Sequence, residues 1–280
     1  RVCPAPCQDG CNRNEVEDYV GINSVEQFIG DHALQAKLAF AAAEQETGKR
    51  VAIIGGGVAG LAAAYQLRRL GHGATIFDER EELGGMTRYG IPGYRMPRDV
   101  MDGEIRRILD MGVEVHMQTR VGRDISYEQL ETDYDAILLA IGAQQGRTLN
   151  IPGGDAPNCV SGVAFLAAFN EGRMQHTASK VVVIGGGDTA MDVVSVARRL
   201  GHINSPLPGD RPESVIRDLT AHDVATTASR DGSEVLLIYR RPVEQMPAAE
   251  HERITAEKEG IELRGSLAPK ELVIGADGRA

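Results

Sequence analysis

The sequence predicts an α/β fold in which two nucleotide-binding domains follow each other along the chain. Two segments, 51–60 and 181–190, each contain an apolar run, three successive glycines and then a helix-forming stretch. A buried strand, a tight turn and a helix in this order place free backbone N–H groups at the start of the helix, where they favour a phosphate. Because the pattern occurs twice, about 130 residues apart, we expect two dinucleotides in one protein.

Composition narrows the class of protein. The chain has 280 residues and a formal net charge of −10 at pH 7, which argues against a nucleic-acid or anionic-membrane surface. No apolar run approaches the roughly 18 residues that a membrane span needs. Three of the four cysteines crowd the N-terminus, unlike the dispersed framework of a small secreted domain. We therefore expect a cytoplasmic protein without a nucleic-acid partner or a membrane span.

An N-terminal segment, residues 1–50, precedes the elements of the first Rossmann-like domain. Within this segment, the alanine-rich stretch Leu34–Glu46 favours a helix. After the first glycine turn, the sequence predicts a helix over 61–70, a strand over 74–77, a helix over 98–111 and a buried strand over 135–142. In the second domain it predicts a helix over 160–172, a strand from Lys180, a helix over 189–200, a strand over 234–239 and a helix over 248–259.

The first glycine fingerprint has the spacing of a dinucleotide site. Gly55 permits the tight turn, Gly57 lets the backbone approach a pyrophosphate, and Gly60 lets the helix pack closely on the strand. An acid about 20 residues further on binds the ribose hydroxyls in such sites. Asp78 ends the next strand, and Glu79 is the second candidate. The expected contacts of this domain are Gly55, Gly57, Ala59, Gly60, Asp78, Glu79 and Gly142.

The second fingerprint predicts a nicotinamide-cofactor site. Here the strand after the glycine turn ends in Arg240 and Arg241 instead of an acid. Two guanidinium groups at this place suit the 2′-phosphate of NADP. A solvated basic strand end is the alternative, and the use of NAD stays open. The expected contacts are Gly185, Gly187, Asp188, Thr189, Ala190, Arg240 and Arg241.

The N-terminal cysteines Cys3, Cys7 and Cys11 are spaced four residues apart. Thiolates this close together can hold an iron–sulfur cluster. Structural zinc more often uses C-x2-C pairs, so a cluster, a zinc ion and free thiols all stay open. No C-x-x-C pair stands near either glycine turn, and a disulfide reductase would need one.

The chain resembles the small subunit of bacterial glutamate synthase and the N-terminal portion of dihydropyrimidine dehydrogenase. The segments that carry this resemblance are 1–11, 49–61, 83–86, 89–97, 185–192 and 239–248. The resemblance implies FAD in the first site, NAD(P)H in the second and [4Fe–4S] clusters in a helical N-terminal domain. It also implies that Gly84 and Gly85 contact FAD and that Arg95 lies near the flavin. Cys3, Cys7 and Cys11 match cluster cysteines, and Glu26 matches a non-cysteine ligand.

This resemblance divides the chain into three parts. Residues 1–48 are expected to be the edge of the iron–sulfur domain, 49–155 the FAD-binding domain and 156–280 the NAD(P)-binding domain. The sequence lacks the family's upstream cysteines. It also lacks the C-terminal Gly-Asp segment that completes the family's flavin domain. We therefore expect the chain to be a fragment of a longer polypeptide. An insertion at about 203–232 exceeds the family's short turn by roughly 30 residues, and we expect it to pack on a partner subunit.

The function expected from these features is electron transfer within a larger oxidoreductase. Electrons would pass between NAD(P)H, FAD and iron–sulfur clusters, to or from a catalytic partner subunit. No side chain is expected to act as a catalytic acid or base. Two alternatives are a glutamate synthase small subunit proper and a non-catalytic scaffold subunit that keeps the fold.

Overall fold

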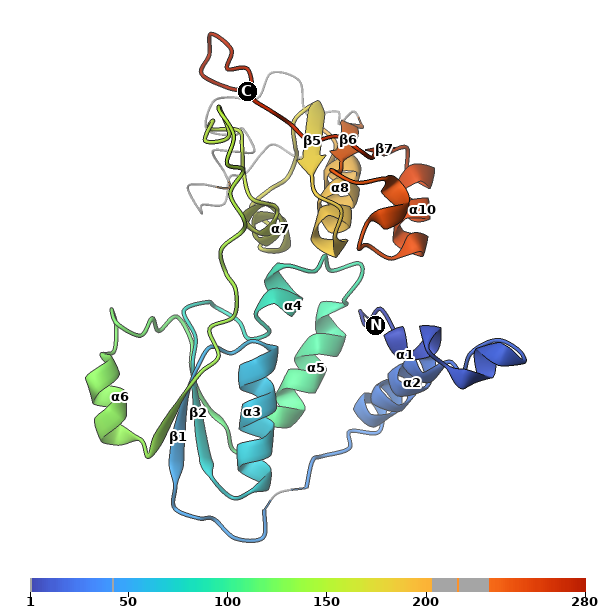
Figure 1. Cartoon of the computed structure of the whole chain (residues 1–280). Helices are drawn as coiled ribbons and strands as arrows, with labels where there is room; N and C mark the ends of the chain where they lie inside the picture. Colours follow the sequence, from blue (N-terminus) through green and yellow to red (C-terminus); the bar gives the residue numbers. More distant parts are fainter. Residues whose placement is uncertain (1, 42, 203–215, 217–231) are drawn as a thin grey trace. The chain divides into compact units, whose positions relative to one another are not determined.

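The computed structural model describes residues 2–41, 43–202, 216 and 232–280 (Figure 1). The chain divides into two compact units. Unit 1 comprises residues 1–88 and 93–142, and unit 2 comprises 89–92 and 143–280. Nearly all of the expected insertion at 203–232 lies outside the described residues. Within the described ranges, no helix combines the length and the apolar character that crossing a bilayer requires.

Unit 1 holds a four-stranded parallel sheet in the order β3-β2-β1-β4. Its central strands bury Ile53 and Ile76 completely, as expected for parallel strands covered on a face by helices. Helices α3 and α5 cover one face, and Leu130 of α6 packs on the other. The elements are α1 (Pro6–Asp9), η1 (Asn12–Glu15), α2 (Ile22–Gln35), β1 (Arg50–Ile54), α3 (Val58–Arg69), β2 (Gly73–Phe77), α4 (Met86–Tyr89, whose last residue is assigned to unit 2), α5 (Arg98–Leu109), β3 (Glu114–His116), α6 (Tyr127–Asp133) and β4 (Ala136–Leu139).

Unit 2 holds a second parallel sheet in the order β5-β6-β7. Its core contains Leu237 of β6 and Val194 and Val196 of α8, all fully buried. The elements are α7 (Gly162–Asn170), β5 (Lys180–Ile184), α8 (Asp188–Leu200), β6 (Glu234–Ile238), η3 (Val243–Gln245), α10 (Glu250–Lys258) and β7 (Glu262–Arg264). Two parallel sheets confirm the α/β class that the sequence predicts.

The helix predicted over Leu34–Glu46 is wrong, because α2 ends at Gln35. Lys37 adopts a left-handed backbone conformation with φ of 51°. The chain after it is held by Arg107 of α5, whose Nε donates to the Leu38 carbonyl at 2.9 Å and whose guanidinium lies 4.1 Å from the Phe40 ring centroid. These tertiary contacts outweigh the helix propensity of the alanines.

The strand predicted over 135–142 exists but is not buried. It spans Ala136–Leu139, and the side chain of Leu139 is 61% exposed. The reason is its position, because β4 is the outer strand of the described sheet and pairs there with β1 alone. The same holds for β5 in unit 2, where Val182 is 58% exposed.

Candidate functional site

The first glycine turn lies at the carboxyl end of β1, against β4. Gly55 has a φ of 109°, and a Cβ added there would overlap with the carbonyl of Ala140. Its N–H donates to the Phe77 carbonyl at 2.8 Å, which ties the turn to β2. A Cβ at Gly60 would overlap with the Gly55 carbonyl, so α3 approaches the turn as closely as a helix can. This is the close helix–strand packing that the spacing predicts.

The start of α3 is open to an anion. Gly57 is the N-cap residue, and no side chain in the described part of the chain caps the helix. Val58 and Ala59 of the first turn are exposed. Uncapped N–H groups at the positive end of a 12-residue helix attract a phosphate.

The structure separates the two candidate ribose acids. Asp78 faces the glycine turn, where its Oδ2 accepts a hydrogen bond from the Gly56 N–H at 2.6 Å and its Oδ1 accepts one from the Arg80 N–H at 2.9 Å. Glu79 lies 3.6 Å from the guanidinium of Arg120 and is half-exposed. Of the two acids, only Asp78 therefore contacts the glycine turn.

A second glycine pair closes over the first turn. The Gly84 N–H donates to the Gly56 carbonyl at 2.9 Å, and a Cβ at Gly85 would lie 2.7 Å from the Gly57 Cα. The sequence analysis missed Gly56, although a Cβ there would overlap with the side chain of Leu83. The only sequence signal for it is that three glycines stand in a row.

Two arginines lie in unit 1 near the start of α5. Arg95, expected near the flavin, is partly buried in the loop before this helix. Arg98 donates to the Thr87 and Arg88 carbonyls at 3.3 and 2.6 Å. Burial lowers the pKa of the Arg98 guanidinium, and the neighbouring charge of Arg88 adds to the effect. Gly142 follows β4 with a φ of 65°.

Asp78 provides a direct test of this site. If Asp78 binds the ribose of FAD as the sequence predicts, we expect Asp78→Asn to weaken FAD binding about tenfold, because a neutral amide would replace the carboxylate. Glu79→Gln is the matched control, since Glu79 points to Arg120 and its replacement should leave FAD binding unchanged. Calorimetric titration of FAD into the unliganded protein measures both. Equal losses in the two variants would contradict the assignment.

The second glycine turn, in unit 2, repeats the first with one difference. Gly187 is the N-cap residue of the 13-residue α8, again without a side-chain cap among the described residues. Ala190 stands where the first turn has Gly60, and its N–H donates to the Gly187 carbonyl at 2.8 Å. Asp188 and Thr189 are exposed in the first turn. The Asp188 carboxylate can accept from a hydroxyl or water, but as an anion it repels a phosphate.

Unit 2 also closes a loop over its glycine turn. The Ala248 N–H donates to the Gly186 carbonyl at 3.0 Å, as the Gly84 N–H does to Gly56. A Cβ at Gly186 would lie 2.7 Å from the Tyr239 ring. Gly186 is therefore the second position that the sequence analysis missed. In both units the middle glycine accepts the bond that fixes the covering loop.

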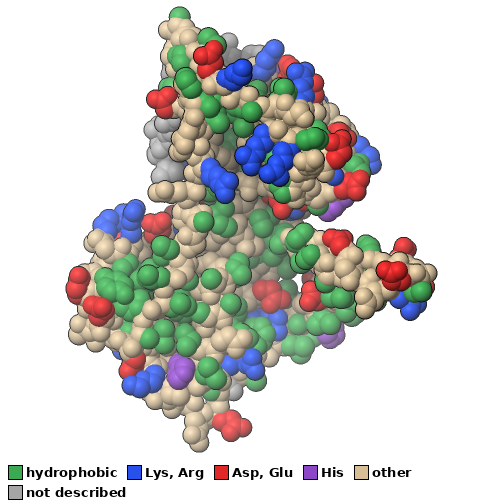
Figure 2. All heavy atoms as spheres, viewed as in Figure 1, with side chains coloured by type: hydrophobic (Ala, Val, Ile, Leu, Met, Phe, Trp, Pro, Cys, Tyr) green, Lys and Arg blue, Asp and Glu red, His purple; other side chains and the backbone are tan. Residues whose placement is uncertain are grey.

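The two arginines predicted to bind a 2′-phosphate follow β6. Arg240 and Arg241 are both exposed, and Figure 2 shows basic side chains gathered on the face of unit 2 in this view. The Arg241 carbonyl accepts from the Ser266 N–H at 2.8 Å, so the segment after β7 fixes the backbone at this point. The arginines stand at the strand end that in unit 1 carries Asp78.

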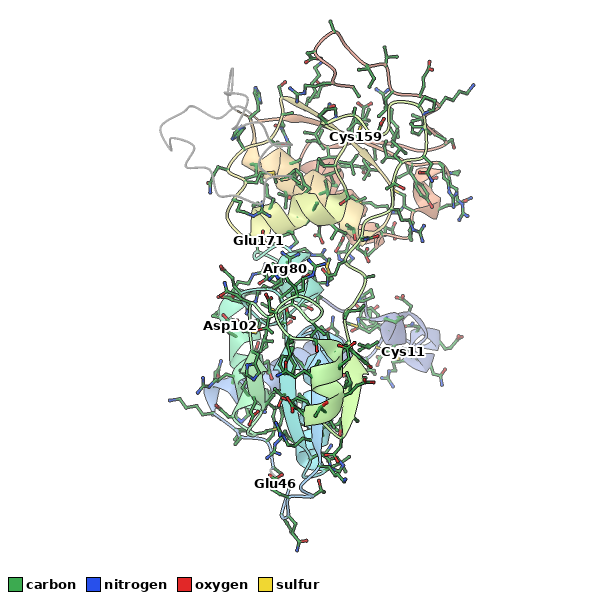
Figure 3. The ribbon with its side chains drawn as sticks, turned by 90° about the vertical axis from the view of Figure 1, so that its left-hand side faces the viewer. Cys11, Glu46, Arg80, Asp102, Cys159 and Glu171 are labelled. Atoms are coloured by element: carbon green, nitrogen blue, oxygen red, sulfur yellow. The ribbon has the colours of Figure 1, made fainter. Side chains whose placement is uncertain are left out.

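The N-terminal cysteines do not form a metal centre in the structure. Cys3 and Cys7 are exposed, and Glu26 lies exposed on α2. Cys11, labelled in Figure 3, is partly exposed. Among the described residues, no three His, Cys, Asp or Glu side chains lie close enough together to hold a metal ion. A backbone hydrogen bond from Val20, and a weaker one from Arg13, lower the pKa of the Cys11 thiol. The assignment of these residues to an iron–sulfur cluster therefore stays a prediction.

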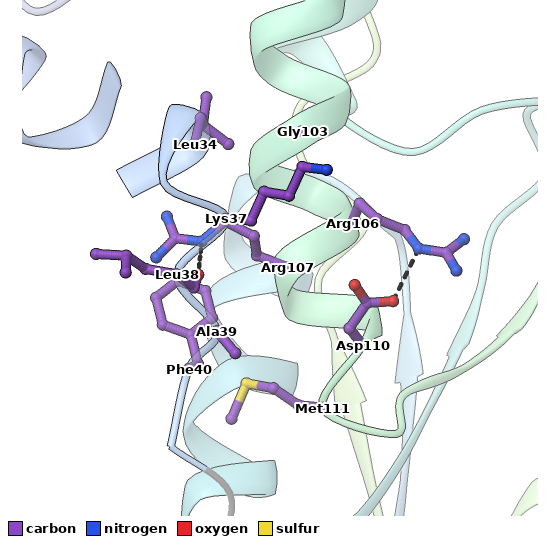
Figure 4. Close-up of a pocket in the computed structure, with 10 residues that line it drawn as sticks. All are labelled: Leu34, Lys37, Leu38, Ala39, Phe40, Gly103, Arg106, Arg107, Asp110 and Met111. Atoms are coloured by element: carbon purple, nitrogen blue, oxygen red, sulfur yellow. Dashed lines mark hydrogen bonds and ion pairs between the residues drawn. The ribbon is translucent and has the colours of Figure 1, made fainter. Parts of the chain in front are cut away.

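A cavity of about 320 Å³ lies between the end of α2 and α5, away from the predicted site residues (Figure 4). Its walls include Leu34, Phe40 and Met111, and Arg107 crosses it to reach the Leu38 carbonyl. It contains none of the residues that the sequence assigns to a cofactor. We therefore interpret it as packing space between the N-terminal segment and α5.

Comparisons with known proteins agree with this architecture. Residues 49–273 match the family described as pyridine nucleotide-disulphide oxidoreductase. The chain is 35% identical over 298 residues to the NADP(+)-dependent formate dehydrogenase subunit beta of Moorella thermoacetica, covering 98% of this chain and 38% of that protein. It is 32% identical over 293 residues to the glutamate synthase (NADPH) small chain of Escherichia coli, covering 100% of this chain and 56% of that protein. The second match confirms the resemblance to glutamate synthase small subunits.

The chain thus spans about half or less of the length of these two relatives. Among solved structures, Mycobacterium tuberculosis FprA in complex with NADPH superposes with a TM-score of 0.54 and 24% sequence identity. That match covers 75% of this chain and 47% of the other. At this identity the likeness concerns the fold alone.

Proposed function

Because the chain belongs to the pyridine nucleotide-disulphide oxidoreductase family, we propose that it is an NADPH-dependent flavoprotein unit that transfers electrons within a larger oxidoreductase. FAD binds to unit 1 and NADPH to unit 2. The observation that carries the proposal is the pair of glycine turns, each leading into an uncapped helix. The strand after the first turn leads to Asp78, which suits the ribose of FAD, and the strand after the second leads to Arg240 and Arg241, which suit the 2′-phosphate of NADPH.

The residues of unit 1 fit an FAD molecule by their chemistry. The first turn of α3 offers N–H groups to the pyrophosphate, and Asp78 offers a carboxylate to the ribose. Gly84 and Gly85 keep the covering loop free of side chains next to the turn. A flavin bound here would supply the conversion between a two-electron hydride and single electrons.

The residues of unit 2 fit NADPH in the same way. The uncapped backbone N–H groups at the start of α8 donate to the pyrophosphate, and the Asp188 carboxylate faces a hydroxyl or water instead of the phosphate. Arg240 and Arg241 bind the 2′-phosphate that distinguishes NADPH from NADH. The protein's task is to hold both dinucleotides and to exclude competing reactions. No described side chain needs to donate or accept a proton.

The partner is proposed from the relatives. The formate dehydrogenase subunit beta and the glutamate synthase small chain are, by name, parts of larger enzymes. We infer that this chain likewise delivers electrons to a partner subunit. An iron–sulfur cluster is a candidate for the next carrier, but the cysteines of this chain form no ligand group, so we assign no step to it.

The absorption spectrum of the purified protein tests the proposal. Bound FAD gives an absorption band at about 450 nm, and anaerobic addition of NADPH should bleach this band by reducing the flavin. A protein that stays colourless after incubation with FAD would contradict the proposal and favour the scaffold alternative. Iron analysis of the same sample shows whether the protein contains an iron–sulfur cluster. Identification of the subunits that co-purify distinguishes a glutamate synthase small subunit from other electron-transfer subunits.

A further inference from the structure

Arg88 is the most completely enclosed cation that contacts the covering loop of unit 1. It belongs to α4, and only 11% of its side chain is exposed. Its Nε donates to the Leu83 carbonyl at 2.5 Å. Its two terminal nitrogens form ion pairs with Glu82 of the loop and with Asp102 of α5, which Figure 3 labels. One guanidinium thus joins three points of the chain.

These contacts bear on the glycine pair that follows Leu83. A Cβ at Gly84 would lie 3.1 Å from the Arg88 Cβ and 3.1 Å from the Met101 sulfur, so the stem of Arg88 fills the space beneath this glycine. Above it, the Gly84 N–H donates to the Gly56 carbonyl. The loop therefore lies between the arginine on one side and the first glycine turn on the other.

Because Arg88 is enclosed, breaking one of its contacts is costly. A buried cation is retained when its hydrogen-bonding groups have partners, and here the planar fork meets a carbonyl and two carboxylates. Glu82 and Asp102 remain more than half exposed, so the arginine is the buried centre of the arrangement. Lysine has no comparable fork and could satisfy only part of it.

We propose that Arg88 is a positioning residue for FAD, which fixes Leu83, Gly84 and Gly85 against the first glycine turn before the cofactor binds. This inference rests on the proposed function, because the sequence resemblance assigns Gly84 and Gly85 to FAD and no role to Arg88. Arg88 itself does not touch the ligand in this assignment. It lowers the cost of binding by holding the loop in the shape that FAD requires.

The test compares Arg88→Met, Arg88→Lys and Arg106→Met. Arg106 is the matched control, because it lies on α5, is 75% exposed and pairs only with its helix neighbour Asp110 among the described residues (Figure 4). We expect Arg88→Met to weaken FAD binding about 10- to 100-fold, as expected for lost charged hydrogen bonds. Arg88→Lys should restore part of the affinity, and Arg106→Met should match wild type. NADPH binding, a property of unit 2, should not change.

Amide hydrogen exchange in the unliganded protein gives a second readout. The N–H groups of Gly84, Thr87 and Arg88 are bonded within the loop and to Gly56. In Arg88→Met they should exchange faster, while those of β1 and β2 keep their wild-type rates. Acceleration throughout unit 1 would instead mean general destabilisation and would overturn the inference. So would unchanged FAD affinity in Arg88→Met.

One further outcome separates this inference from the proposed function, and a second variant keeps the test decisive. If wild-type protein takes up no FAD, the proposed function fails and exchange at residues 84–88 alone decides whether Arg88 orders the loop. If Arg88→Met does not fold, Asp102→Asn replaces it, since it removes one ion pair and leaves the arginine in place. Wild-type exchange and FAD affinity in Asp102→Asn would then contradict the proposal.

Discussion

Gly60→Ala is expected to weaken FAD binding by about 100-fold or more, because α3 must move away from the glycine turn. The added Cβ would overlap with the Gly55 carbonyl, and a backbone oxygen cannot rotate aside as a side chain can. Any shift of α3 carries its first-turn N–H groups away from the pyrophosphate. The free energy of unfolding should also fall, by about 3 kcal/mol, the upper end of the usual cost of overpacking.

Fluorescence titration with FAD and urea unfolding measure the two effects of Gly60→Ala. The natural control lies in the second turn, where Ala190 occupies the corresponding position. Ala190→Gly should cost at most about 1 kcal/mol of stability, the price of a glycine in a helix, and should not change FAD affinity. If Gly60→Ala bound FAD as tightly as wild type, the close approach of α3 would have no role in binding.

Replacing both Arg240 and Arg241 by glutamine should weaken NADPH binding about 100-fold and leave NADH binding within about threefold of wild type. In the proposed function, each arginine would offer a charged fork to the 2′-phosphate, which NADH lacks. Both side chains are exposed, so their removal should not disturb the core. Because the attraction acts between exposed charges, the NADPH affinity of wild type should also decrease with added salt.

Stopped-flow or equilibrium titration with each nucleotide separates the two affinities. Arg264→Gln serves as the matched control, since Arg264 lies on the adjacent strand β7, is about half exposed and pairs with Glu262 at 2.6 Å. It should leave both nucleotides unaffected. A double variant that loses NADPH and NADH equally would show that these arginines act on a feature shared by both, such as the pyrophosphate.

The glycine turns and the strands that lead into them could be predicted because their signals are local. A run such as 51–54 is apolar throughout, and the glycines after it mark the turn. The sequence also ranks Asp78 before Glu79, because Asp78 comes directly after the strand. The hydrogen bond from the Gly56 N–H to Asp78 could not be predicted, because only the fold shows which side chain faces Gly56. The hydrogen bonds from Gly84 to Gly56 and from Ala248 to Gly186 could not be predicted either, because they join residues 28 and 62 positions apart in the sequence.

The errors have physical causes of the same kind. Propensity favours a helix over Leu34–Glu46, but Arg107 is about 70 positions away in the sequence and binds the Leu38 carbonyl. Hydrophobicity predicts that β4 is buried, whereas burial depends on what lies beside the strand. The cluster assignment of Cys3, Cys7 and Cys11 is a different case and stays a prediction, because their spacing is compatible with a cluster but their side chains do not come together in the described structure.

The outer positions of β4 and β5 have a practical consequence for handling this polypeptide. Each presents apolar side chains, among them Leu139 and Val182, along the border of a described sheet. Such borders recruit strands from other molecules, so concentrated samples should self-associate and light scattering should rise with protein concentration. Val182→Lys should reduce this self-association, because a charge on an edge strand disfavours pairing with a strand of another molecule.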